Sequence, residues 1–131
     1  MSNARFAYDR LRSTYDTLTK GLDRLALNRM RRQLLETNAA GRVLEVGIGT
    51  GKNLAFYPAK LEITGLDISS KSIDVARQRA VEQNIRFERV VADAISMPFE
   101  DAVFDTVVLT MTACQFDGPS ARRVFRETRR V

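Results

Sequence analysis

The chain has 131 residues, of which 44% are hydrophobic and 28% charged, and its net charge is +5. This composition excludes a disordered chain and a collagen-like repeat, and it predicts one domain with a real core. A single cysteine, Cys114, allows no intramolecular disulfide, and the first residues lack the pattern of a secretory signal. We therefore expect a reducing, intracellular compartment, with Cys114 as a buried thiol.

Two further classes of protein are excluded by residue content. No apolar run approaches the roughly 20 residues that a membrane-spanning helix needs. The sequence has no histidine, so mechanisms that need an imidazole are excluded and we expect no metal site.

The positive charge is concentrated at the N-terminal end. Residues 1–42 hold nine Lys or Arg against four Asp or Glu, whereas residues 43–131 hold twelve of each. A segment with such an excess is drawn to anionic surfaces, either phosphate backbones or acidic lipids.

Residues 5–37 are predicted to be helical, with a break near Gly21. Their apolar side chains recur every three or four positions, which places them on one stripe of a helix. The stripe consists of Tyr8, Leu11, Tyr15, Leu18, Leu22 and Leu25. Arginines fill much of the remaining surface, so we expect basic amphipathic helices over residues 1–41.

From residue 42 onward, short apolar runs alternate with helical patterns. The runs at 43–46, 61–66, 87–91 and 104–110 predict strands, and the last is nearly continuous, as in a sheet covered on both faces. Strand–helix alternation at this spacing predicts an α/β fold with a doubly wound, mostly parallel sheet.

Two helices are predicted among these strands. Ser69 or Ser70 can cap the first, which would end near Asn84 and turn Ile73, Ala76 and Ala80 inward. Pro119 can occupy the first turn of the second. Its predicted inner face consists of Ala121, Val124, Phe125 and Thr128.

The segment EVGIGTG at 45–51 follows the first strand, and we expect a helix directly after it. Its glycines permit a tight turn and a close approach of the backbone to a ligand. Asp67 ends the second strand and can accept hydrogen bonds from ribose hydroxyls, and Asp93 and Ala94 follow the third. These residues should converge on the crevice where open α/β sheets bind ligands.

Three nucleotide interpretations compete for this loop. The dinucleotide pattern G-x-G-x-x-G fails because Lys52 occupies the position of its third glycine. The P-loop pattern fails in its glycine spacing, and again because Asn53 follows the lysine. A glycine turn for an amino acid end and an acid for a ribose suit S-adenosylmethionine instead.

The segments VLEVGIGTGKN, GLDIS, ADAISMPF and FDTVVLTMTACQF together resemble the consecutive motifs of class I S-adenosylmethionine-dependent methyltransferases. The resemblance runs from about Arg42 to Val131, implies a Rossmann-like core over residues 42–131, and implies S-adenosylhomocysteine as the product. The family normally continues into a glycine turn and further strands, so we expect a C-terminally incomplete sheet of about four strands. Its last strand would then be an open edge, and a strand-swapped homodimer is one way to cover it.

The resemblance assigns roles residue by residue. Gly47 and Gly49 would line the methionine end, in a loop that also contains Ile48 and Gly51, and Glu45 would hold that loop or reach the cofactor ammonium through water. The remaining expected contacts are Asp67 with the ribose, Ile68 with the adenine, Asp93 and Ala94 beside the adenine amino group, and Thr110 and Met111 facing the methyl group.

The N-terminal segment YDRLRSTYD is similar to a subgroup that methylates phosphatidylethanolamine or precursors of ubiquinone and menaquinone. In that subgroup a helix closes over the cofactor, which would make Tyr15 a lid residue that contacts it. The expected catalytic residues are Tyr15 and Tyr8. The candidates for removing a proton from an amine acceptor are these tyrosines, Asp93, Asp117 or water.

The preferred functional hypothesis is N-methylation of a phospholipid head group by a cytoplasmic enzyme bound peripherally at the inner membrane face. Its basic helices would contact anionic lipid. The alternatives are methylation of a quinone precursor or small soluble metabolite, and a non-catalytic domain that binds S-adenosylmethionine. No nucleic acid partner is expected, because the aromatic and basic residues are not interleaved as in known RNA-binding modules.

Overall fold

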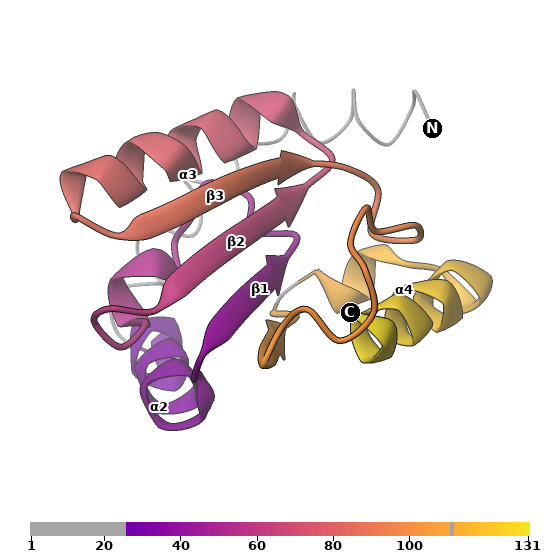
Figure 1. The fold of residues 1–131 in the computed structure, drawn as a ribbon, viewed down its shortest axis with the longest axis horizontal. Helices are drawn as coiled ribbons and strands as arrows, with labels where there is room; N and C mark the ends of the chain where they lie inside the picture. Colours follow the sequence, from indigo (N-terminus) through magenta and orange to yellow (C-terminus); the bar gives the residue numbers. More distant parts are fainter. Residues whose placement is uncertain (1–25, 111) are drawn as a thin grey trace.

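The computed structural model describes residues 26–110 and 112–131 (Figure 1). Helix α2, Asn28–Asn38, overlaps the C-terminal part of the helical segment predicted over 5–37. The predictions for Gly21, Tyr8, Tyr15 and Met111 lie outside the described residues.

The described strands form one parallel sheet of four strands in the order β3-β2-β1-β4. The strands are β1 Arg42–Val46, β2 Glu62–Asp67, β3 Arg86–Val91 and β4 Thr106–Val108. The predicted parallel α/β sheet is therefore confirmed (Figure 1). Strand β4 is shorter than the predicted 104–110, in part because the Phe104 N–H donates to the carbonyl of Val131 (2.8 Å) and not to a neighbouring strand.

Helices cover both faces of this sheet, and the side chains of β1 alternate between them. Val43 belongs to a core cluster with residues of α2 and of helix α3, Ser70–Glu82, on one face. Leu44 and Val46 belong to a second cluster on the other face, with Val124 of helix α4, Gly118–Arg130. The two faces can therefore carry different polar sites.

The predicted starts of α3 and α4 are confirmed by their caps. The Ser69 hydroxyl accepts a hydrogen bond from the Ser72 N–H (3.3 Å), so Ser69 is the cap of α3. Pro119 lies in the first turn of α4, and the Asp117 carboxylate accepts from the Ser120 N–H (2.9 Å). These side chains satisfy backbone donors that a helix leaves unpaired at its first turn.

Two predictions of burial are wrong. Phe125 was expected on the inner face of α4, but it is 52% exposed and Val124 is the buried residue of the helix. Position 125 shares a side of the helix with 122 and 129, which lie three and four residues away and carry arginines, and this side faces outward. Cys114 is exposed, because it lies in a short 3-10 helix, Ala113–Gln115, that contains no buried residue.

The helix expected directly after the glycine loop is a 3-10 turn instead, η2, Leu54–Phe56. Tyr57, which follows it, is extended (φ −74°, ψ 143°). Because Pro58 disfavours helical geometry at the residue before it, the segment stops after one turn. Leu54 and Phe56 are nevertheless buried in the core cluster on the α3 side.

We expect Gly51→Ala to destabilise the fold. Gly51 has φ +77°, and a Cβ atom there would lie 2.7 Å from Leu54 Cδ1 and 2.9 Å from Ala76 Cβ. The left-handed backbone should cost about 1–2 kcal/mol and the overpacking about 1–3 kcal/mol. Urea denaturation of the ligand-free protein measures the change.

The matched control is Gly118→Ala at the start of α4, where an added Cβ would meet no atom within 4 Å. We expect this control to change the free energy of unfolding by less than about 0.5 kcal/mol. Equal stability of the two variants would contradict the packing argument for Gly51.

Candidate functional site

The glycine loop at the end of β1 depends on left-handed backbone conformations. Gly47, Gly49 and Gly51 have φ values of +70°, +57° and +77°. A Cβ atom at Gly47 would lie 2.4 Å from the Thr112 side chain, and the Thr112 hydroxyl is 3.2 Å from the Gly47 carbonyl oxygen. The loop is thus held against the segment that follows β4, and only glycine permits that approach.

Asp67 joins the end of β2 to this loop. Its carboxylate is buried, with Oδ2 accepting from the Gly49 N–H (2.7 Å) and Oδ1 accepting from the Ser69 N–H (2.9 Å). Because each carboxylate oxygen has more than one lone pair, the group can still accept hydrogen bonds from the hydroxyls of a ligand.

A cavity of about 450 Å³ opens at the carboxyl ends of the strands. Five of the residues predicted from sequence line it together: Gly47, Asp67, Ile68, Asp93 and Ala94. The cavity combines apolar walls with three carboxylates, those of Asp67, Asp93 and Asp117. Such a mixture suits a ligand with a flat apolar ring, hydroxyls and an amino group.

Five other predicted residues do not line this cavity. Ile48 packs in the core on the α3 side, Gly49 holds Asp67, and Gly51 lies against Leu54 and Ala76. Glu45 and Thr110 belong to a separate polar cluster. Their predicted contacts with a cofactor remain predictions.

The cluster around Glu45 is buried on the α3 side of the sheet. Glu45 is 3% exposed, and its two carboxylate oxygens accept from Asn53 Nδ2 (2.7 Å) and from the Tyr57 hydroxyl (2.8 Å). Asn53 Nδ2 also donates to the Thr110 hydroxyl oxygen (2.8 Å), while Asn53 Oδ1 is buried with no hydrogen-bond partner among the described residues. The cluster therefore links β1, the loop after it and the segment that follows β4.

Burial raises the pKa of Glu45 to about 7, and the hydrogen bonds from Tyr57 and Asn53 and the charge of Arg31 oppose this rise. Burial and the adjacent Glu45 raise the pKa of Tyr57 well above its ordinary value, so its hydroxyl stays a donor. Asn53 and Tyr57 were not predicted as functional residues. Their sequence signal is that both are polar residues on either side of the apolar segment Leu54–Phe56.

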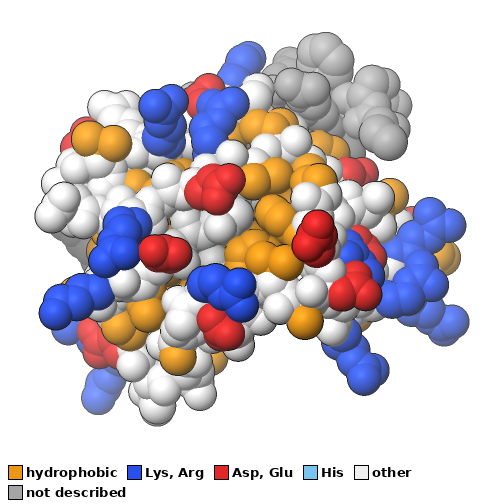
Figure 2. All heavy atoms as spheres, in the orientation of Figure 1, with side chains coloured by type: hydrophobic (Ala, Val, Ile, Leu, Met, Phe, Trp, Pro, Cys, Tyr) orange, Lys and Arg blue, Asp and Glu red, His pale blue; other side chains and the backbone are white. Residues whose placement is uncertain are grey.

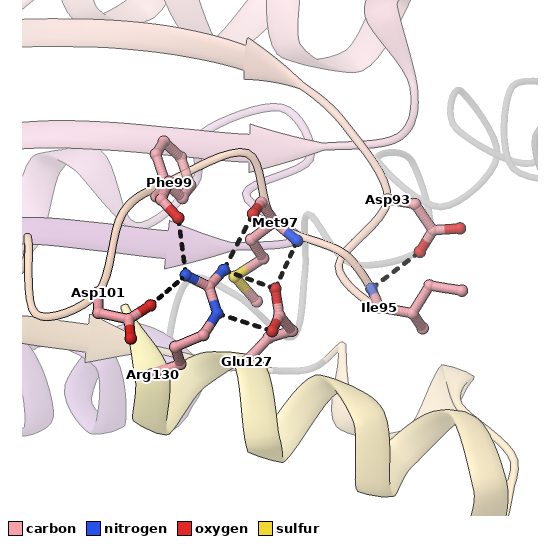
Figure 3. A network of polar contacts seen from close by, with 7 residues as sticks. All are labelled: Asp93, Ile95, Met97, Phe99, Asp101, Glu127 and Arg130. Carbon is pink, nitrogen blue, oxygen red and sulfur yellow. Dashed lines mark hydrogen bonds and ion pairs between the residues drawn. The ribbon is translucent and has the colours of Figure 1, made fainter.

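A second polar network fixes the segment that follows Asp93 (Figure 3). The Arg130 guanidinium donates to the carbonyls of Met97 (3.0 Å) and Phe99 (2.7 Å) and to the carboxylates of Asp101 (2.9 Å) and Glu127 (2.8 Å). Glu127 also accepts from the Met97 N–H (2.7 Å), and these bonds lower its pKa to about 2.

This network lies beside one wall of the cavity. Asp93 and Ile95, which line the cavity, are joined by a hydrogen bond from the Ile95 N–H to Asp93 Oδ1 (3.0 Å), as Figure 3 shows. Helix α4 thus anchors the chain just beyond these two residues.

The wall formed after β4 was largely missed by sequence reasoning. Asp117 was considered only as a proton acceptor, and the other lining residues here are Thr112, Gln115, Phe116 and Ser120. The available signal was position, because residues that follow any strand of a parallel sheet reach the same edge.

Comparison with known proteins identifies the family. Residues 43–131 match the protein family described as "Methyltransferase domain". Over 131 residues, the chain is 36% identical to the demethylmenaquinone methyltransferase of Thermotoga maritima, covering 95% of this chain and 54% of that protein. Over 104 residues, it is 36% identical to the phosphatidylethanolamine N-methyltransferase of Cereibacter sphaeroides, covering 77% of this chain and 50% of that protein.

The chain spans about half the length of these curated relatives. A solved S-adenosylmethionine-dependent methyltransferase of Thermotoga maritima superposes with a TM-score of 0.71 at 26% identity, covering 94% of this chain and 54% of that one. The Rossmann-like fold and the resemblance drawn from the sequence motifs are both confirmed. The chain belongs to the class I S-adenosylmethionine-dependent methyltransferases.

Proposed function

We propose that the cavity at the carboxyl edge of the sheet binds S-adenosylmethionine and that this protein transfers its methyl group to an acceptor. The observation that carries the proposal is the convergence of Gly47, Asp67, Ile68 and Asp93 on one cavity. The donor set fits the cofactor: Asp67 can accept from ribose hydroxyls, Ile68 can pack on adenine, and Asp93 can accept from an amino group.

When bound, S-adenosylmethionine supplies an electrophilic methyl group and a sulfur leaving group, so the protein needs no strong nucleophile of its own. The chain's residues bind, align the reactants and exclude water. Gly47 brings the glycine loop to the cavity, where the amino acid end would lie, and Glu45 holds the segment after that loop through Asn53 and Tyr57. An amine acceptor must lose a proton before it attacks, and Asp117 is a carboxylate in the cavity wall that could accept it, because Asp93 is assigned to the adenine amino group.

For the acceptor, we propose the head group of a phospholipid such as phosphatidylethanolamine, methylated at a membrane surface. Support comes from the relative of Cereibacter sphaeroides and from the basic excess of residues 1–42. No helix among the described residues is long and apolar enough to cross a bilayer. The second candidate is a quinone precursor, favoured by the relative of Thermotoga maritima, whose match covers more of the chain.

We expect Asp67→Asn to weaken S-adenosylmethionine binding by about 30- to 150-fold. A carboxylate that accepts hydrogen bonds contributes about 2–3 kcal/mol more than an amide that satisfies only part of the donors. Titration calorimetry measures the affinity, with Asp74→Asn on α3 as the control, because Asp74 pairs with Arg89 at the surface. Unchanged affinity in the Asp67 variant would refute its assignment to the ribose.

Glu45 should make the stability of the protein depend on pH. Its folded-state pKa of about 7 exceeds its ordinary value of 4.5, so between these pH values the folded state binds more protons than the unfolded state. Stability should therefore fall by up to about 3 kcal/mol as the pH rises from 4.5 through 7. Urea denaturation at pH 5 and pH 8 measures this fall.

We expect Glu45→Gln to flatten that pH profile, since the amide does not titrate, and the exposed Glu88→Gln to leave it unchanged. Glu127, whose pKa is lowered to about 2, changes the stability with pH only below the range of pH 4.5 to 7. If the free energy of unfolding fell equally between pH 5 and pH 8 in Glu45→Gln and in the unaltered protein, the role of Glu45 would be contradicted.

The acceptor is tested by supplying isotope-labelled S-adenosylmethionine with phosphatidylethanolamine vesicles or with demethylated quinone precursors. We expect label in the methylated lipid and none in the quinone fraction. Label only in the quinone would replace the first acceptor with the second, and label in neither, with cofactor binding intact, would favour a non-catalytic binding domain.

A further inference from the structure

Helix α4 presents a basic face to the outside of the molecule. Its arginines at 122, 123, 126 and 129 are exposed, and Phe125 beside them is 52% exposed. Positions 122, 126 and 129 follow one another at intervals of four and three residues, so they share one side of the helix. In Figure 2, Lys and Arg side chains gather at the right-hand end of the molecule, where Figure 1 places α4.

These arginines differ from several others among the described residues, which form ion pairs with acidic side chains. Arg42 pairs with Asp105 (3.3 Å), Arg86 with Glu62 (3.1 Å) and Arg130 with Glu127 (2.8 Å). Within residues 26–110 and 112–131, none of the four outward arginines of α4 forms an ion pair.

Such an arrangement disfavours the isolated helix. Like charges spaced three or four residues apart repel one another, and here Arg126 faces both Arg122 and Arg129 at those spacings. An anionic partner would convert this repulsion into attraction. The basic face therefore has a physical reason to bind a negatively charged surface.

The same helix begins at the ligand cavity. Asp117 and Ser120 line that cavity, while Gly118, Pro119, Arg122, Arg123 and Arg126 line a shallow hollow of about 550 Å³ on the outer side of the same turn. A surface that holds the arginines would therefore lie next to the segment that walls the cavity.

We propose that the outward face of α4 docks on an anionic phospholipid bilayer. Arg122, Arg123, Arg126 and Arg129 contact lipid phosphates, and Phe125 enters the interfacial region. Phe125 favours a bilayer over a nucleic acid, because an apolar ring beside a basic row gains by burial among acyl chains. The docking does not depend on the proposed function. Our inference that docking brings a lipid head group to the cavity does rest on the proposed function.

The test is flotation of the full chain with vesicles of phosphatidylcholine, with and without phosphatidylglycerol. A basic residue near an anionic surface raises binding about fivefold, so R122Q/R126Q should lower the partition onto anionic vesicles by roughly 30-fold. R122K/R126K keeps the charge and should stay within about threefold of the unaltered chain. The difference between the variants should shrink at high salt.

The matched control is K71Q/R77Q, which removes the same charge from exposed positions on α3, on the other side of the sheet. We expect its partition to change by less than about threefold. An equal loss in both double variants would show a response to net charge only and would overturn the proposal.

Two further outcomes would also overturn it. Unaltered flotation of R122Q/R126Q would assign any membrane binding to another segment. If the same variant lost binding to RNA while its flotation was unaltered, the partner of α4 would be a nucleic acid. Calorimetry with S-adenosylmethionine on the same variant separates the two proposals, because α4 docking predicts unchanged cofactor affinity. Failure of methyl transfer with intact flotation would count against the proposed function and leave the docking surface in place.

Discussion

The hydrogen bonds of the Asp67 carboxylate hold the site together. One oxygen accepts from the glycine loop at Gly49 and the other from Ser69, the residue that caps α3. A single buried side chain therefore fixes the end of β2, the loop after β1 and the start of a helix relative to one another. Hydrogen bonds to a buried charge are stronger than neutral ones, and leaving such a charge without them is costly.

The alternation of side chains along β1 separates the buried Glu45 cluster from the ligand cavity. Glu45 points to the α3 side, where Asn53 and Tyr57 satisfy it, while Leu44 and Val46 face the α4 side beneath the cavity wall. The segment after β4 contacts both the Glu45 cluster and the glycine loop at the cavity, because Thr110 bonds to Asn53 and Thr112 lies against Gly47. A change at the end of β4 can therefore reach the glycine loop from two directions.

The sequence predicted those features that depend on local chemistry. Strand positions, the Ser69 cap and the convergence of Gly47, Asp67 and Asp93 follow from apolar periodicity, capping and the common edge of parallel strands. The helix expected after the glycine loop was wrong because the effect of Pro58 on Tyr57 outweighed the expected strand–helix alternation. Phe125 was misplaced because a spacing of three or four residues does not tell which side of a helix meets the core.

Long-range contacts were out of reach of the sequence. Glu127 and Arg130 looked like ordinary surface charges, yet they bind the backbone of Met97 and Phe99 about thirty residues away (Figure 3). Asn53 and Tyr57 acquire their importance only because β1 brings the buried Glu45 between them. Such pairings depend on tertiary packing, which no local pattern records.

The exposure of Cys114 has a practical consequence. It is the chain's sole cysteine, and its neighbour Gln115 lines the cavity. A thiol-reactive dye would therefore attach at one defined position, close enough to the cavity for its emission to follow ligand occupancy without any engineered residue.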